Sequence, residues 1–416
     1  MIDDAFPGGY QVEVADVNGD KKPDIVALGG STLAWYENPT WTKRVVSTSK
    51  ETPDIISSAT ADLDGDGMAE IAIAYDFSMN EPKRGKLLLA IQGAKVDDPW
   101  TFTPMVDANQ SRGVGGGIAG GGGSGGTNGA AGRLHESSLS RVPSIHRLRW
   151  GIYPSVRVSP GSVSFEKKQA LFVASIFGPS AKPPLFNQDP ARLVVFDPGA
   201  EPKSGHWKSY RVGEAPVLHA IELVDLGDQG VSTVLGASNQ GVTSYRLNPV
   251  LGVGDFFQAS DLATGALGEA PKKGSSEVHL GKLRNGRKFL ATVEPWHGTD
   301  VVVYLSESLD PLKFGPRTVI DTSLKEGHAL WVADVDGDGD DEVFAGYRGG
   351  GGGVLMFDRD GSDWVRTILD PGVTAQDLRG GDLDGDGRPD VVAIGGQSHN
   401  VVWYRPIPNE SKKARD

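Results

Sequence analysis

The sequence predicts an all-β protein, a seven-bladed β-propeller of four-stranded antiparallel blades. Three observations predict this fold. An acidic loop pattern occurs four times, at residues 16–24, 62–70, 334–342 and 382–390. Short, β-branched apolar runs follow each loop, which indicates strands rather than helices. Weaker copies of the same unit lie between these loops, and seven units over 416 residues give a period typical of propeller blades.

Each acidic loop places carboxylate or amide oxygens at its first, third, fifth and ninth positions. Hard oxygen ligands in a tight, glycine-containing loop suit calcium. An EF-hand would instead need its last carboxylate at the twelfth position and a helix on either side. We therefore expect each loop to join the first two strands of a blade, as an A–B loop, and up to four structural Ca²⁺ ions in all. The predicted ligands are Asp16, Asn18, Asp20, Asp24, Asp62, Asp64, Asp66, Glu70, Asp334, Asp336, Asp338, Glu342, Asp382, Asp384, Asp386 and Asp390.

The remaining strands of each unit have their own signals. The third strand is aromatic, as in residues 33–36 and 401–404, and the fourth often opens with tryptophan, as at Trp41, Trp207 and Trp364. Four strands per unit complete a blade. The acidic loops and the strands after them resemble the FG-GAP/VCBS repeats of seven-bladed propellers over nearly the whole chain. That resemblance implies the fold but not the function, because such propellers serve as enzymes, adhesins and scaffolds.

We expect residues 1–416 to form one propeller domain with two interruptions. Residues 113–132 are mostly glycine and predict a disordered insertion at the end of blade two. Residues 152–188 lengthen blade three and are expected to rise over one face. Residues 407–416 form a polar tail.

Composition excludes several classes of protein. The formal charge of −13 argues against a nucleic-acid surface, and no apolar run is long enough for a membrane span. The absence of cysteine excludes disulfides and thiol chemistry.

Neither end of the chain carries a complete fourth strand for the last blade, and Met1 opens no signal peptide. We expect the natural start to lie upstream: the protein is cytoplasmic as written, and secreted if an upstream start adds a leader.

Histidines recur at one repeat position. Six residues before each A–B loop, the first strands carry Tyr10, Ile56, His146, His219, Ser276, His328 and Gln376. Around a common axis these residues should converge at the channel mouth opposite the acidic loops. The loops between second and third strands, the B–C loops, share that face and add Trp296, His297, Arg348 and His399. A polar, solvated channel lining with paired charges is the structural alternative.

A second ring lies three residues before each A–B loop. Alternation along a strand turns this position toward the channel as well. Its polar and aromatic members are Glu13, Arg149, Glu222, His279, Trp331 and Arg379. Charged groups in a narrow tube should perturb one another's pKa values. The aromatic side chains of Tyr10, Trp296 and Trp331 suit stacking against a sugar, or packing.

These side chains allow more than one chemistry. Converging neutral imidazoles suit a divalent metal such as zinc, and a single imidazole suits general base catalysis near neutral pH. Arg149, Arg348 or Arg379 could hold a carboxylate or a developing oxyanion. No Gly-x-Ser-x-Gly elbow supports acyl transfer. The two carboxylates that a glycosidase needs would have to be Glu13 and Glu222, which lie far apart around the ring.

Four segments, residues 144–150, 294–298, 326–331 and 376–379, resemble the propeller domain of the aldos-2-ulose dehydratases. The resemblance implies a carbon–oxygen lyase that dehydrates keto-sugars by β-elimination with divalent metal ions. The implied catalytic residues are His146, His219, His297, His328, Arg149 and Arg379. That family has cupin domains after the propeller, and nothing cupin-like follows here. The alternatives are a non-catalytic, calcium-stabilised propeller that binds carbohydrate or protein, and a scaffold without a ligand.

Overall fold

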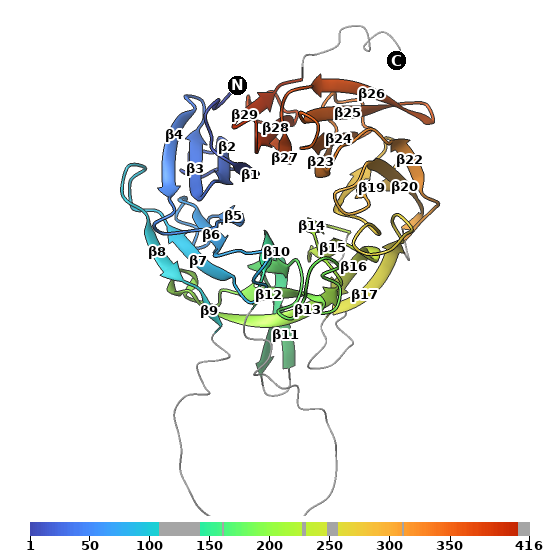
Figure 1. Ribbon diagram of the computed structural model, residues 1–416. Coiled ribbons are helices and arrows are strands. Elements are labelled where there is room, and N and C mark those ends of the chain that lie inside the picture. The colour runs from blue at the N-terminus through green and yellow to red at the C-terminus, as the bar shows by residue number, and fades with distance from the viewer. Residues whose placement is uncertain (108–141, 160–161, 227–229, 248–256, 310–311, 407–416) are drawn as a thin grey trace, which may run out of the picture.

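The computed structural model describes residues 1–107, 142–159, 162–226, 230–247, 257–309 and 312–406, and it shows seven blades in a ring around a central channel (Figure 1). The first strand of each blade lines the channel, and the later strands lie progressively outward. First strands of neighbouring blades contact one another all the way around the ring. The prediction of a seven-bladed propeller with antiparallel blades is confirmed.

The strands follow the blades in chain order. Blades one and two contain β1 (Gly9–Ala15), β2 (Asp24–Gly29), β3 (Thr32–Glu37), β4 (Thr42–Ser47), β5 (Ser57–Ala61), β6 (Glu70–Tyr75), β7 (Lys86–Ile91) and β8 (Thr101–Pro104). Blade three contains β10 (Ile145–Ser159), β11 (Ser162–Ser175), β12 (Ala191–Asp197) and β13 (His206–Ala215), with β9 (Val106–Asp107) added in parallel to β13. Blade four contains β14 (Ala220–Val224), β15 (Thr233–Ser238), β16 (Gly241–Leu247) and β17 (Phe257–Ala263).

The last three blades vary at their outer edge. Blade five contains β18 (Glu277–Lys282), β19 (Lys288–Glu294) and β20 (Asp300–Leu309), and both β21 (Leu312–Phe314) and β22 (Thr318–Asp321) pair with β20. Blade six contains β23 (Gly327–Ala333), β24 (Glu342–Tyr347), β25 (Gly353–Asp360) and β26 (Asp363–Asp370). Blade seven contains β27 (Ala375–Gly381), β28 (Asp390–Gly395) and β29 (Val401–Tyr404). Its fourth position is therefore open to another part of the chain.

Among the described residues, seven hydrophobic clusters lie one between each pair of neighbouring blades. The second strands, such as β2 and β28, are buried along their whole length, because they have a neighbouring blade on both faces. Continuous apolar runs are the sequence pattern of strands buried on both faces. Apolar burial between blades therefore closes the ring.

The N-terminal residues complete blade seven. The backbone N–H of Ile2 donates to the carbonyl of Val401 (2.9 Å), and Val401 N–H donates to the carbonyl of Asp3 (2.8 Å). Phe6 N–H donates to the carbonyl of His399 (2.8 Å), and the Phe6 ring is fully buried between blades seven and one. Among the residues that the structure describes, blade seven thus has three strands, as expected from the lack of a complete fourth strand at either end, and residues 2–6 add only a short bridge at Asp3.

Blade three is lengthened as predicted, but on both faces of the ring rather than on one. The β10–β11 hairpin extends on the side of the A–B loops, and residues 176–190 form a loop on the opposite side. The predicted insertion at residues 113–132 and the polar tail at residues 407–416 lie outside the described residues. Within the described part of the chain, no helix has the length and apolar character that a membrane span needs.

Replacing Phe6 tests this closure. Phe6→Ala should lower the free energy of unfolding by about 3–5 kcal/mol, because a buried aromatic ring is lost at the seam where the ring closes. The measurement is chemical denaturation followed by tryptophan fluorescence. Leu267→Ala is the control, since Leu267 is 91% exposed and should show no measurable loss. Equal stability of the two variants would show that residues 2–6 do not close the propeller.

Candidate functional site

A repeated β-bulge shapes the channel mouth. In blades one, three, six and seven the strand register shifts at one residue, which is Tyr10, His146, His328 or Gln376. His219 occupies the same place in blade four. Its N–H donates to the carbonyl of Ala237, and the next residue, Ala220, also pairs with Ala237. A bulge breaks the alternation of side chains and re-aims one of them. Here it brings residues from separate blades to one opening.

Four predicted histidines meet at this opening. Ring centroids of His219 lie 4.7 Å from His146, 4.9 Å from His297 and 5.1 Å from His328. The Nε2 atoms of His219 and His297 are 3.0 Å apart. Ligand nitrogens of His219, His297 and His328 all lie within 4.8 Å of one another. The B–C loop of blade five supplies His297, whose φ of 47° is held in the left-handed region.

Backbone carbonyls of the next blade orient three of these rings. Nδ1 of His146 lies 2.8 Å from the carbonyl oxygen of His219, and Nδ1 of His219 lies 3.0 Å from that of Ser276. Nδ1 of His328 lies 2.7 Å from the carbonyl oxygen of Gln376. Because a carbonyl can only accept, each Nδ1 carries the proton and each Nε2 presents a lone pair. Such contacts are the ones that fix metal-binding histidines in their ligating tautomer.

Aromatic and cationic side chains surround the histidines. The Tyr10 hydroxyl donates to Nε2 of His146 (2.7 Å), and the Trp296 ring lies 5.1 Å from the ring of His297. Arg348 Nη2 donates to Nδ1 of His297 (3.2 Å). The sequence therefore placed Tyr10, Trp296 and Arg348 correctly beside the histidines.

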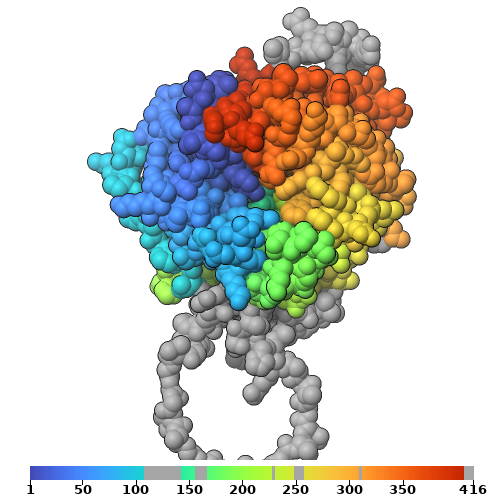
Figure 2. Space-filling model, viewed as in Figure 1, coloured from blue at the N-terminus to red at the C-terminus, as the bar shows by residue number. Residues whose placement is uncertain are grey.

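An apolar cluster covers part of this mouth. Phe186 packs on Trp296 and Phe177, and Phe77 from blade two lies 6.1 Å from His146. In Figure 2 the loops after β6 (light blue) and β11 (green) stand side by side on the face toward the viewer. This cover keeps the imidazoles largely dry.

Burial sets the protonation of the histidines. Desolvation, followed by neighbouring cations and imidazoles, lowers the pKa of His146, His219, His297 and His328 well below 6.5. At neutral pH all four rings are therefore uncharged. An uncharged imidazole presents a lone pair that can bind a metal ion or accept a proton.

Two functional neighbours were missed from the sequence. Glu277 Oε1 lies 2.9 Å from Nδ1 of His219 and 3.5 Å from Nη2 of Arg147, and both new residues are buried. The guanidinium of Arg147 also lies 5.7 Å from the ring centroid of Tyr10. Strict alternation would turn these residues away from the channel. The bulge at His146 turns Arg147 inward. In blade five, Ser276 N–H donates to the carbonyl of Val293, the residue that pairs with Glu277, which gives the same irregularity. A polar residue directly after the recurring histidine position was the available signal.

The second predicted ring forms a separate layer within the channel. His279 lies between Glu222 (Nδ1 to Oε1, 3.6 Å) and Arg379 (Nε2 to Nη1, 3.3 Å). Burial raises the pKa of Glu222 to about 7 and lowers that of His279 to about 4. Arg149 is the cation that opposes the shift of Glu222. These residues thus interact with one another, and the structure records none of their side chains in contact with the four histidines.

Three members of the predicted set have other contacts. Glu13 accepts from the Ser58 hydroxyl and from Thr60 N–H (3.0 Å), which joins blades one and two. Trp331 packs on Phe344 and over Gly380 between blades six and seven, so its predicted role in sugar stacking is not retained. His399 is exposed, and its Nδ1 accepts from Gly8 N–H (3.1 Å), so it holds the N-terminal segment instead of lining the mouth.

The four acidic loops share one internal geometry. The first carboxylate accepts from backbone N–H groups of the loop, as Asp334 does from Gly337 (2.7 Å) and Gly339 (3.0 Å). The ninth carboxylate is buried, and one oxygen accepts from the second residue, as Glu342 does from Val335 (2.9 Å). The other oxygen of Glu342 has no hydrogen-bond partner among the described residues. A buried, unpaired carboxylate oxygen facing other carboxylates fits a calcium site.

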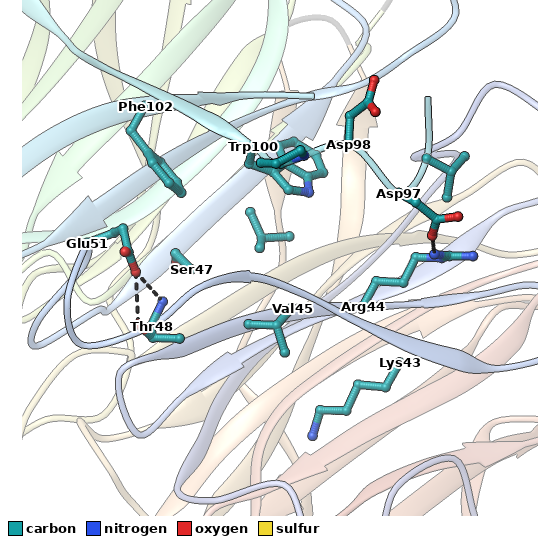
Figure 3. A pocket seen from close by; sticks show the side chains of 13 residues that line it. Lys43, Arg44, Val45, Ser47, Thr48, Glu51, Asp97, Asp98, Trp100 and Phe102 are labelled. Atoms are coloured by element: carbon teal, nitrogen blue, oxygen red, sulfur yellow. Dashed lines mark hydrogen bonds and ion pairs between the residues drawn. The ribbon is translucent and has the colours of Figure 1, made fainter. Parts of the chain in front are cut away.

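A groove on the outer rim is a weaker candidate. It has a volume of about 470 Å³ and lies between blades one and two (Figure 3). Arg44 is paired with Asp97, and Glu51 accepts from the N–H of Thr48 (3.1 Å). No histidine lines it, and these charged groups already interact with one another. The histidine mouth is therefore the candidate functional site.

Comparisons with known proteins agree with this architecture. A family model described as FG-GAP-like repeat matches residues 8–73 and 334–393, which contain all four acidic loops. The β-propeller domain of Swd1 from Myceliophteria thermophila is similar, with 10% identity, a TM-score of 0.51 and coverage of 96% of this chain and 98% of that chain. Kuenenia stuttgartiensis hydrazine synthase has 13% identity, a TM-score of 0.50 and 97% coverage of both chains.

At these identities the structural likeness concerns the fold alone. A search of curated proteins found no match. The chain is a seven-bladed β-propeller that contains FG-GAP-like repeats.

The channel layer should give a pH-dependent stability. The pKa of Glu222 is about 7 in the folded protein against an ordinary value of 4.5, so the unfolded chain ionises first as pH rises. This carboxyl therefore lowers the free energy of unfolding progressively between about pH 5 and pH 8. Glu222→Gln should be nearly neutral at pH 5 and stabilising at pH 8, by up to about 3 kcal/mol.

Thermal denaturation at both pH values measures this effect. Glu269→Gln is the control, because Glu269 is exposed and its replacement should change stability equally at pH 5 and pH 8. A Glu222→Gln effect that is the same at the two pH values would contradict the raised pKa.

Proposed function

We propose that the channel mouth binds one divalent metal ion, zinc or a related ion, through His219, His297 and His328. We further propose that the protein is a carbohydrate-active lyase that dehydrates keto-sugars by β-elimination. The observation that carries the proposal is the convergence of three uncharged imidazoles in a largely dry site. Two of them, His219 and His328, are oriented by backbone carbonyls of the next blade. Three histidines with a position left for substrate are a common catalytic donor set.

The donor set fits such an ion. Nε2 of His219 and of His328 already presents a lone pair, because Nδ1 of each ring donates to a backbone carbonyl, a usual partner of metal-binding histidines. His297 would ligate after moving its ring proton to Nδ1, where Arg348 now donates. Ligation would therefore separate Arg348 from His297 and would leave the guanidinium available at the mouth. When bound, the ion would polarise a sugar carbonyl and acidify the neighbouring C–H.

The chain's own residues supply the remaining parts of an elimination. Arg348 can hold a carboxylate or an enolate oxygen. Burial raises the pKa of Tyr10, so its hydroxyl stays protonated and can give that proton to the departing hydroxyl, which leaves as water. Nε2 of His146, released from Tyr10, accepts the proton from the carbon next to the carbonyl. Return of the proton from His146 to Tyr10 across the 2.7 Å hydrogen bond restores the starting state.

The aromatic lining supports a sugar ligand. The Trp296 ring lies 5.1 Å from that of His297 and the Tyr10 ring 5.5 Å from that of His328, and aromatic faces stack on the C–H groups of sugar rings. The indole N–H of Trp296 is buried and has no hydrogen-bond partner among the described residues. The same lining would serve the second candidate, a non-catalytic carbohydrate-binding propeller. Binding without product would favour that candidate.

A turnover assay with matched histidine variants tests the proposal. The purified protein with Zn²⁺ or Mn²⁺ is incubated with keto-sugars and acidic glycans, and ultraviolet absorbance reports an enone or unsaturated product. His328→Ala should lower the rate by about 100-fold or more, since it removes a ligand of the metal. His206→Ala should leave the rate unchanged, because His206 is exposed on the outer strand β13. Absence of product from every substrate, or equal rates for the two variants, would contradict the enzymatic proposal.

We also propose that the acidic loops at residues 16–24, 334–342 and 382–390 bind structural calcium. Removing the ion with a chelator should lower the melting temperature by about 5 °C or more, because an ion that binds the folded state alone stabilises it. Adding Ca²⁺ should restore it. Differential scanning fluorimetry in both conditions measures the change. A melting temperature that does not respond to chelator would contradict calcium binding by these loops.

A further inference from the structure

One acidic loop already contains a cation from the protein itself. Lys203 lies in the 3-10 turn η2 (Pro202–Ser204), which precedes β13 in blade three. Its Nζ lies 2.7 Å from Asp64 Oδ2, 2.9 Å from Asp66 Oδ2 and 3.0 Å from Glu70 Oε1. These three carboxylates stand at the third, fifth and ninth positions of the loop at residues 62–70. They are three of the four side chains predicted to bind calcium there.

The backbone holds this lysine against the loop. Gly205, directly after the turn, accepts from Val106 N–H of the neighbouring segment (2.9 Å). The fully buried Trp207 donates its indole N–H to the carbonyl of Pro202 (2.8 Å). A side chain at Gly205 would approach Pro104 O to within 2.6 Å, and its φ of 69° also favours glycine. The turn is therefore fixed against the outer edge of blade two, and this holds Lys203 beside the carboxylates of the loop at residues 62–70.

The other three loops differ in this respect. Basic side chains contact third- or fifth-position carboxylates there: Lys22 reaches Asp20 (3.8 Å) and Arg284 reaches Asp338 (2.8 Å). In the loop at residues 382–390, Arg388 reaches Asp386 (2.6 Å) and Arg405 reaches Asp384 (3.4 Å). Among the described residues, the ninth-position carboxylates of these loops form no ion pair. Glu70 is the exception, because its buried oxygen contacts the Lys203 ammonium.

We infer that Lys203 is the resident cation of the loop at residues 62–70 and that it excludes calcium from that loop. Calcium binds oxygen ligands at about 2.3–2.6 Å. An ion at that distance from Asp64, Asp66 and Glu70 would occupy the space now taken by Nζ, and two cations cannot share one set of carboxylates at contact distance. The A–B turn of blade two is thus stabilised by blade three rather than by a metal, and the chain has three calcium loops instead of four. This inference is independent of the histidine site.

Counting bound calcium in the full-length protein tests the inference. The protein is stripped with chelator, supplied with Ca²⁺ and examined by native mass spectrometry. Lys203→Met should bind one calcium ion more than the wild type, because the loop then has its carboxylates free. Asp64→Asn in the wild-type background should leave the count unchanged. Arg388→Met, which removes a basic group from the rim of another loop, is the matched control and should also leave the count unchanged.

Two outcomes would overturn the inference. A count that Asp64→Asn lowers by one would show that calcium already occupies this loop beside Lys203. An unchanged count in a folded Lys203→Met variant would show that the ammonium does not stand in the calcium position. If Lys203→Met fails to fold, the comparison of Asp64→Asn with the wild type decides: equal counts support the inference, and a lower count overturns it.

Discussion

A backbone irregularity at the start of the first strands is the constraint on which the candidate site depends. It is a register shift in blades one, three, six and seven, and in blades two, four and five it is an extra N–H contact to the carbonyl of a paired residue. It lets two successive residues face the channel instead of one. The first of the pair reaches the mouth, as His146 and His328 do. The second joins neighbouring blades: Asp377 accepts from Val12 N–H (3.3 Å), Ser57 accepts from Leu148 N–H (3.1 Å), and Gln11 donates to the carbonyl of Ser58 (2.9 Å). One backbone irregularity, repeated around the ring, therefore positions the site and links neighbouring blades by hydrogen bonds.

Much of the fold and part of the site could be predicted from the sequence, because both repeat. The acidic loops and their weaker copies marked where the first strand of each blade ends. The residues six positions before these marks include His146, His219 and His328, which the structure brings together. His297 and Arg348 followed from the face on which B–C loops must lie. Repetition also explains the errors. Strict alternation hid Arg147 and Glu277, since a bulge leaves no clear mark in a single sequence. Trp331 shares a repeat position with channel residues, yet it packs over Gly380 because that neighbour has no side chain.

The two faces of the ring use charge in opposite ways. On the face of the A–B loops, carboxylates cluster in each loop, and at Glu70 the neighbouring cation is Lys203. At the opposite mouth, neutral imidazoles lie among Arg147, Arg348 and Lys272. Desolvation is the largest cause of the lowered pKa of His297, and the charges of these three residues lower it further. A site of this kind favours a ligand with negative charge or one that develops it during reaction. The layer of Glu222, His279 and Arg379 lies within the channel itself.

Anomalous X-ray diffraction from crystals soaked in Zn²⁺ would locate a metal ion at the proposed histidine site. We expect one anomalous peak about 2.0–2.1 Å from the Nε2 atoms of His219, His297 and His328, with Arg348 no longer bonded to His297. A map without a peak at the mouth, in which His297 still pairs with His219 and Arg348, would contradict the proposed metal site.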